Sequence, residues 1–232
     1  MNENQINFFL SENLKKYRNR DLKSFYLGTF ASDEISSKNL RVNTLTKPLN
    51  FCFICNSLTR ENDKEPGHWL LISIHFSPLL KKMNVKFMDS FALPYRHYGG
   101  VSKYIDNLRQ QSFTQNIYFC LESLSKPLQY SESEICGGYA CFVVLKQVSW
   151  KNMSLKKIFA SFKPSRPKSN DLIIAQFIRK LWPVRTCSSI EGDMIKKPTF
   201  SWNKNRGNIA PFCPKKVYKD SKCLPICTCD KD

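Results

Sequence analysis

The feature that most restricts the fold is the run Trp69–Phe76 (WLLISIHF), which is almost continuously apolar. Its length is that of a strand, and a strand with few polar positions is typical of a sheet that is covered on both faces. The run is also far too short to cross a bilayer. We therefore expect Trp69–Phe76 to be a buried strand of a folded domain.

Other elements can be placed around this strand by their apolar patterns. Strands are predicted at Leu49–Cys55 (or a buried turn there), Val85–Met88 and Asn116–Leu121, with a short extended piece within residues 25–36. Residues 137–150 are apolar on nearly every side, as in a helix buried in a domain. Amphipathic helices are predicted at 11–25, with Ser11 as N-cap, and at Asp171–Leu181. Together these elements predict an α+β domain with a central mixed or antiparallel sheet packed by helices.

Composition places the chain among globular proteins. With 42% apolar and 13% aromatic residues it can bury a substantial core. Its first residues have neither the basic region nor the apolar run of a signal peptide, so we expect a protein that is made and used inside a cell. In a reducing compartment its ten cysteines should be thiols, metal ligands or a nucleophile rather than a disulfide framework.

The composition changes after about residue 162. Residues 163–232 contain seven of the twelve prolines and 15 Lys and Arg against 6 Asp and Glu, a net charge of +9 out of +17 for the chain. We expect one domain at 1–186 and a basic, proline- and cysteine-containing tail at 187–232 that is only partly ordered. The charge also predicts non-specific, electrostatic binding of DNA, the alternative being a basic protein without a polyanion partner.

The candidate nucleophile is Cys136, where a polar loop meets the predicted buried helix. A cysteine at a helix N-terminus lies at the positive end of the helix dipole, which favours the thiolate. Gly137 and Gly138 follow it, and we expect them to let a substrate backbone approach and to leave main-chain N–H groups for an oxyanion. The alternative for a cysteine before a helix is simple burial.

A thiolate that attacks a carbonyl needs a base, and the chain has three histidines. His75 lies inside the apolar strand, where a packed histidine is expected, and His97 lies in a loop that is expected to be exposed. His68 immediately precedes the strand, so its side chain can project from a rigid element into a site. Asp89 ends the following strand and can accept a hydrogen bond from the imidazole.

The order of these residues resembles the protease clan that holds the adenovirus protease (adenain) and the SUMO-specific proteases. The motif is Gly-His-Trp at 67–69, an acidic residue about twenty positions later, then Gln129, then Cys136-Gly137. Gln129 precedes Cys136 by seven residues, as in adenoviral proteases. The segments FYLGTF (25–30), HWLLISIHFSP (68–78) and CLESLSKPLQ (120–129) also resemble adenain, over roughly residues 15–150.

The resemblance implies a cysteine endopeptidase with a papain-like arrangement of the adenain type, in which the nucleophile begins a buried helix. Cys136, His68 and Asp89 would form the triad, and the side-chain amide of Gln129 would stabilise the oxyanion. Asp89 departs from the glutamate common in adenoviral proteases and is the SUMO-protease choice. We therefore expect a divergent virus or a virus-derived element as the source.

The resemblance also implies substrates and partners. Expected substrates are viral precursor proteins, cleaved during virion maturation at glycine-containing sites with an apolar residue upstream. Trp69 could form a wall of the cleft or belong to the core. DNA and a viral peptide are expected activators, and Cys120 could form a disulfide with that peptide or be a packed strand cysteine. We expect a monomer in the host nucleus and the virion, without a membrane, a metal or an organic cofactor.

Two cysteine groups and two other functions are weighed against this interpretation. Cys52 and Cys55 have zinc spacing, but their apolar neighbours favour packing. The tail cysteines could form a zinc site, although their spacing is unusual for one: Cys213, Cys223, Cys227 and Cys229. The alternative functions are a SUMO- or ubiquitin-like deconjugating protease and an inactive, basic nucleic-acid-binding virion protein.

Overall fold

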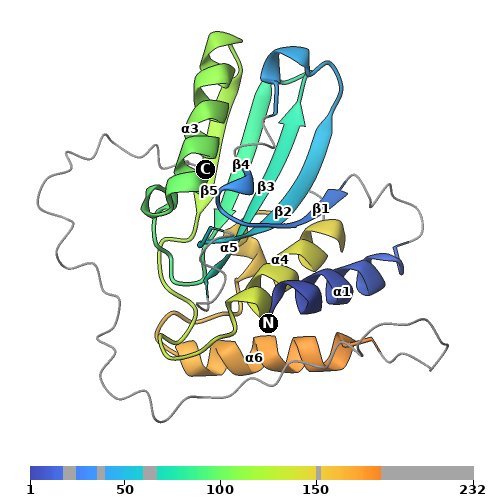
Figure 1. Cartoon of the computed structure of the whole chain (residues 1–232), viewed down its shortest axis with the longest axis vertical. Helices are drawn as coiled ribbons and strands as arrows, with labels where there is room; N and C mark the ends of the chain where they lie inside the picture. Colours follow the sequence, from blue (N-terminus) through green and yellow to red (C-terminus); the bar gives the residue numbers. More distant parts are fainter. Residues whose placement is uncertain (18–24, 36–39, 60–66, 150–152, 184–232) are drawn as a thin grey trace, which may run out of the picture. The chain divides into compact units, whose positions relative to one another are not determined.

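The computed structural model describes residues 1–17, 25–35, 40–59, 67–149 and 153–183. Its centre is a five-stranded sheet in the order β1-β2-β3-β4-β5 (Figure 1). The outer pairs β1–β2 and β4–β5 are parallel, whereas β3 is antiparallel to both of its neighbours. The strands are β1 (Tyr26–Phe30), β2 (Leu49–Asn56), β3 (Trp69–Ser77), β4 (Lys82–Met88) and β5 (Tyr118–Ser123).

Helices cover both faces of this sheet. Helix α3 (Gly99–Thr114) connects the parallel strands β4 and β5 and packs Val101, Ile105 and Leu108 on one face. The opposite face carries the N-terminal and C-terminal helices around the central one: α1 (Glu3–Leu14), α4 (Cys136–Ser149), α5 (Leu155–Ile158) and α6 (Pro167–Leu181). Two short 3-10 helices, Val42–Thr44 and Tyr95–His97, lie in the connections.

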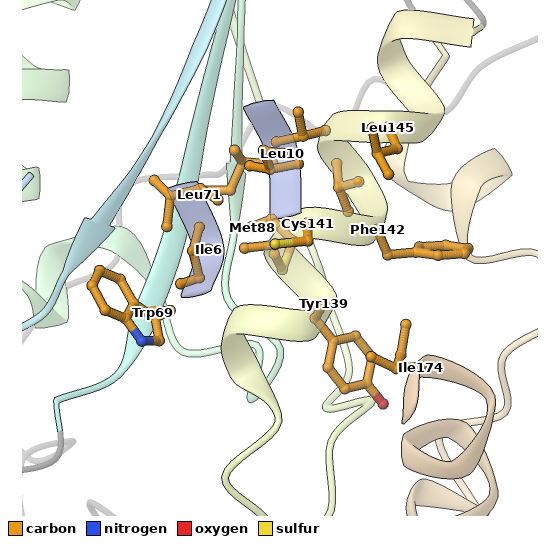
Figure 2. Packing of buried hydrophobic residues seen from close by; sticks show 14 of the residues in the cluster. Ile6, Leu10, Trp69, Leu71, Met88, Tyr139, Cys141, Phe142, Leu145 and Ile174 are labelled. Carbon is orange, nitrogen blue, oxygen red and sulfur yellow. The ribbon is translucent and has the colours of Figure 1, made fainter. Parts of the chain in front are cut away.

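The apolar run of β3 follows from this layering. Trp69 and Leu71 pack with α1 and α4, as Figure 2 shows, while Leu70 and Ile72 contact the cluster beneath α3. Because side chains alternate between two buried faces, the first six residues of the strand, Trp69 to Ile74, are all buried. The expected α+β class, the central mixed sheet, the buried strand and the buried helix are therefore confirmed.

Two helices differ from the sequence-based prediction. The first was expected to begin with Ser11 as N-cap, but it begins at Glu3 and ends at Leu14, so Ser11 lies inside it. Asn2 is the N-cap, because its side chain accepts from the Gln5 backbone N–H while the Gln5 side chain accepts from the Asn2 N–H. Residues 18–24 of the predicted helix lie outside the described residues.

Helix α3 was not predicted, although its apolar positions Val101, Tyr104, Ile105 and Leu108 have helical spacing. The final helix was predicted from Asp171 and begins four residues earlier, at Pro167, where a proline fits the first turn. The tail predicted at 187–232 lies outside the described residues. In the part of the chain that is described, every helix is too short or too polar to pass through a lipid bilayer.

Candidate active site

Antiparallel pairing brings His68 and Asp89 together. His68 immediately precedes β3 and Asp89 immediately follows β4, so the two residues meet at the same end of the strand pair. The Nε2 atom of His68 lies 2.6 Å from Oδ1 of Asp89. Since a carboxylate only accepts, Nε2–H donates this bond, and Nδ1 is the ring nitrogen that remains for another partner.

The carboxylate of Asp89 is almost fully buried and is held by four donors. Besides His68, the backbone N–H groups of Phe91 (2.8 Å) and Leu93 (3.0 Å) and the hydroxyl of Tyr98 (2.8 Å) donate to it. Burial alone would raise the pKa of Asp89, but the hydrogen bond and charge of His68 and the other donors outweigh it, so the pKa lies below its usual value. The acid therefore stays ionised beside the imidazole.

Cys136 is the first residue of α4, and the residue is 7% exposed. The backbone N–H of Trp69 donates to its sulfur at 3.5 Å, and the side chain of His68 hydrogen-bonds it. Because Nε2 of His68 faces Asp89, Nδ1 is the ring nitrogen that is left to interact with the sulfur. The structure thus brings together Cys136, His68 and Asp89, three residues that are far apart in the sequence.

The surroundings favour a thiolate–imidazolium pair. Burial raises the pKa of Cys136, but the positive charge and hydrogen bond of His68 and the Trp69 N–H outweigh it, so the pKa lies below its ordinary value. Burial lowers the pKa of His68, yet the negative sulfur and the hydrogen bond to Asp89 raise it to about 10. Both shifts stabilise the charged forms at neutral pH, the state in which the sulfur is nucleophilic.

Two aromatic residues that the sequence analysis did not single out fix the imidazole plane. The ring of Phe91 stacks on His68 with centroids 4.9 Å apart, and Tyr98 lies 6.4 Å from it at a similar tilt. Phe91 and Tyr98 follow Asp89 closely in the chain, so one connection orients the acid and the base together. The apolar patterns that predict strands and helices do not identify these two residues, because both lie in a connection.

Gln129 is buried in the loop that leads to Cys136. Its Oε1 accepts from the Ser90 hydroxyl at 2.6 Å, and its Nε2 donates one N–H to the Ser133 carbonyl at 2.6 Å. An amide nitrogen carries a second N–H, which is the group that an oxyanion would use. No contact between Gln129 and Cys136 is established by the structure.

Residues of helix α6 hydrogen-bond to the same loop. Asn170 donates to the carbonyl of Leu128 at 2.9 Å. The buried carboxylate of Asp171 accepts from the Tyr130 backbone N–H and, at 2.8 Å, from the hydroxyl of Tyr139 on α4. The residues on both sides of Gln129 are therefore fixed to elements that flank the candidate nucleophile.

Gly137 and Gly138 lie close to buried side chains of neighbouring elements. A Cβ on Gly138 would lie 2.7 Å from Cγ2 of Ile174, and one on Gly137 would lie 3.0 Å from the Ile6 side chain. The Gly138 N–H donates to the Ile135 carbonyl, so it is not available to an oxyanion. Close packing of α4 against its neighbours therefore needs both glycines, and the predicted approach of a substrate backbone to them stays a prediction.

Trp69 also belongs to the core rather than to a cleft wall. Its side chain is 7% exposed, packs in the cluster of Figure 2, and donates from Nε1 to the Met1 carbonyl at 2.8 Å. Of the two interpretations weighed for this residue, core packing is the one that the structure supports. Its contribution to the site is made by its backbone N–H on the Cys136 sulfur.

The remaining predicted residues are not among the hydrogen-bond partners of His68, Asp89 and Cys136 described above. Cys52 and Cys55 are fully buried in β2 and face opposite sides of the sheet, which confirms that they are packing residues. Cys120 lies partly exposed in β5, opposite Asn84. His97 is exposed, as expected, and His75 lies within β3. Within the described ranges no three His, Cys, Asp or Glu side chains are grouped to hold a metal, and the tail cysteines lie outside those ranges.

Comparisons with known proteins give distant likeness only. No protein-family model and no curated protein matches the chain. Among solved structures, it is similar to the ASFV pS273R protease, with 14% identity over 66% of this chain and 63% of that chain and a TM-score of 0.37. The SUMO protease Ulp1 with an oxidised catalytic cysteine gives 17% identity, 76% and 78% coverage and a TM-score of 0.35.

ChlaDub1 from Chlamydia trachomatis gives 14% identity, coverage of 77% of this chain and 76% of that chain, and a TM-score of 0.38. The chain spans less than two thirds of the length of the first of these structures, the ASFV protease. Superpositions this loose carry no argument about activity, so function has to be inferred from the geometry around Cys136.

Proposed function

We propose that the chain is a cysteine endopeptidase with Cys136 as nucleophile, His68 as general base and acid, and Asp89 as the residue that orients His68. The observation that carries the proposal is the continuous set of contacts from the Asp89 carboxylate through the imidazole to the Cys136 sulfur. The lowered pKa of Cys136 and the raised pKa of His68 also support the proposal, because a cysteine peptidase needs a thiolate at neutral pH.

In the acylation step the Cys136 sulfur attacks the carbonyl carbon of the scissile amide. The carbonyl oxygen becomes an oxyanion, which the free N–H of Gln129 and the backbone N–H of Cys136 would stabilise. His68 then gives its Nδ1 proton to the leaving amine, the C–N bond breaks, and a thioester with Cys136 remains. Asp89 keeps the ring in the required orientation through Nε2.

In the second step water attacks the thioester. His68, now neutral, removes a proton from the water, and the thiolate leaves as the carboxylic acid forms. Each role of His68 reverses its role in the first step, which requires the ring to stay in one place. The stacking of Phe91 on the ring supports this requirement.

The substrate class follows from the burial of the nucleophile and from the sequence resemblance to adenain. Because Cys136 is only 7% exposed, a scissile carbonyl with a bulky side chain beside it would meet the surrounding protein, whereas glycine would fit. We propose cleavage of precursor polypeptides at glycine-containing sites, with an apolar residue upstream. For a viral enzyme, these would be virion precursors processed in the host nucleus and the virion.

Thiol labelling tests the nucleophile. The chain should be treated with iodoacetamide at pH 6 and mapped by mass spectrometry. Cys136 should be alkylated at a rate typical of a thiolate, while the fully buried Cys141 on the same helix, whose pKa is raised by burial, should not react. Equal labelling of the two cysteines would contradict the proposal.

Peptide turnover tests the activity. A fluorogenic Leu-x-Gly-Gly peptide should be cleaved by the wild type and not by Cys136→Ala, whereas Cys120→Ser serves as the matched control because Cys120 lies in β5. A ubiquitin-like fusion protein should be assayed in parallel. Cleavage of that fusion without cleavage of precursor peptides would favour the deconjugating protease, for which the aspartate at position 89 is the specific observation.

Two activators belong to the same proposal. DNA is proposed because the chain carries a net charge of +17, and a viral peptide is proposed from the resemblance to adenain, with Cys120 as the residue that would bond to it. Non-reducing gels with candidate peptides should show a Cys120-dependent adduct. In Cys120→Ser that adduct should be lost, so cleavage without the viral peptide should be retained while the gain on adding the peptide should disappear.

A further inference from the structure

Ser90 directly follows the triad acid and has no role in the mechanism described above. Its side chain is fully buried, and its hydroxyl donates to Oε1 of Gln129 at 2.6 Å. Its carbonyl accepts from the backbone N–H groups of Leu128 (2.8 Å) and Gln129 (3.1 Å). One residue therefore holds both the main chain and the side chain of Gln129.

The partners of the Gln129 amide agree on its orientation. The Ser133 carbonyl can only accept, so it must face the nitrogen end of the amide. The Ser90 hydroxyl then faces the oxygen end and donates to it. A flipped amide would place two acceptors against each other at Ser133 and would leave the Ser90 hydroxyl against an N–H group.

The orientation matters because the two ends of the amide have opposite effects on an oxyanion. An N–H group stabilises the developing negative charge, whereas the carbonyl oxygen would repel it. A long side chain in a loop can rotate between these states unless its environment prevents it. Buried hydrogen bonds at both ends restrict that rotation before substrate arrives.

We propose that Ser90 is a positioning residue for oxyanion stabilisation, acting through the amide of Gln129. The inference rests on the proposed peptidase function. Two consecutive residues would then orient two different catalytic groups. Asp89 orients the base His68, and Ser90 orients the oxyanion donor Gln129. A change at Ser90 should therefore affect the chemical step and leave the nucleophile intact.

The test is a double-mutant cycle on cleavage of the Leu-x-Gly-Gly peptide. Gln129→Ala should lower kcat by about 10²–10³-fold, as expected for loss of an oxyanion donor. Ser90→Ala should lower kcat at least about tenfold with little change in KM, because the donor is present but less well oriented. In the Gln129→Ala background, Ser90→Ala should have no further effect on kcat.

Three controls separate positioning from loss of structure. Ser112→Ala removes another fully buried serine hydroxyl, on α3, and should leave kcat unchanged. The alkylation rate of Cys136 at pH 6 should be the same in Ser90→Ala as in the wild type. Ser90→Cys, which keeps a weak donor, should recover part of the lost kcat.

The outcomes distinguish the two proposals. An active wild type in which Ser90→Ala has full kcat overturns the role of Ser90 and leaves the peptidase standing. Additive effects of Ser90→Ala and Gln129→Ala also overturn it. A wild type that neither cleaves the peptide nor shows preferential alkylation of Cys136 overturns the peptidase and the positioning role with it.

Discussion

The carboxylate of Asp89 accepts hydrogen bonds from His68, two backbone N–H groups and the hydroxyl of Tyr98. All four donors favour its charged form, so Asp89 can hold the imidazole without taking its proton. An aspartate suits this place because the N–H groups come from residues two and four positions further along the chain. A longer glutamate would reach past them.

Replacing the acid with its neutral isostere should impair catalysis more than binding. Asp89→Asn is expected to lower kcat by up to about 10⁴-fold, because the amide no longer fixes the ring or stabilises the imidazolium. Steady-state kinetics on the glycine-containing peptide would measure this loss. Asp106→Asn, at a half-exposed aspartate on α3, is the matched control and should leave kcat unchanged.

Comparing Tyr98 with Tyr104 measures how much the hydrogen bond from the Tyr98 hydroxyl to Asp89 stabilises the protein. The Tyr98 hydroxyl donates to Asp89, whereas that of Tyr104 is buried without a partner among the described residues. Tyr98→Phe should lower the free energy of unfolding by about 1.5–3 kcal/mol, and Tyr104→Phe should change it little or raise it. Urea denaturation of the two variants checks this, and equal losses would contradict the role given to Tyr98.

The pH dependence of kcat/KM should reflect the coupled pair. The pKa of Cys136 is lowered, so activity should persist well below the pH at which a free cysteine ionises and fall only as the thiolate is protonated. The pKa of His68 is raised to about 10, so the leaving-group proton is lost, and activity falls, as the pH rises through that value. A profile centred on the ordinary histidine pKa would contradict the ion pair.

Some residues of this site can be found from sequence and others cannot. His68, Asp89 and Cys136 stand at predicted element ends, where a side chain can project from a rigid support. Phe91 and Tyr98 orient His68 only because the connection after β4 folds back over it, which no periodic pattern encodes. For Gly137 and Gly138 the sequence suggested that a substrate backbone could approach. The structure shows that side chains of neighbouring elements lie close to both.

Helix α4 depends on Gly138 for its close contact with α6. A Cβ on Gly138 would meet side chains at 2.7 and 3.1 Å, whereas one on Gly99, at the start of α3, would meet none within 4 Å. Gly138→Ala should destabilise the protein by about 1–3 kcal/mol. Gly99→Ala should stabilise it by about 0.4–1 kcal/mol, because it restricts the unfolded chain. Urea midpoints distinguish the two, and a neutral Gly138→Ala would contradict the close packing.

Strands and helices differ in how well the sequence predicts them here. The strands β2 to β4 carry buried apolar residues and β5 carries the partly buried Phe119 and Leu121, so their apolar patterns are visible in the sequence. Helix α3 begins with two glycines, which are poor helix formers and make its stripe of buried apolar positions hard to recognise in the sequence. The N-cap of α1 is indicated only by Asn2 and Gln5, three positions apart, a short motif at the very start of the helix.

At the level of the whole molecule, charge sets an expected salt dependence. With a net charge of +17, the chain should bind DNA through phosphate contacts that do not depend on sequence. Added DNA should raise peptide turnover at low salt, and the gain should shrink as salt increases. Turnover assays with and without duplex DNA across a salt series test this, and a DNA effect that is independent of salt would exclude the electrostatic mechanism.

The anchoring of the Gln129 loop by Asn170 and Asp171 bears on when the chain becomes active during its own synthesis. The ribosome releases His68, Asp89 and Cys136 before it releases the helix that fixes the loop between them. A nascent chain that ends before α6 therefore carries every residue of the triad but lacks the support for Gln129. We expect such a nascent chain to lack peptidase activity. Surrounding proteins would then not be cleaved until α6 has been synthesised.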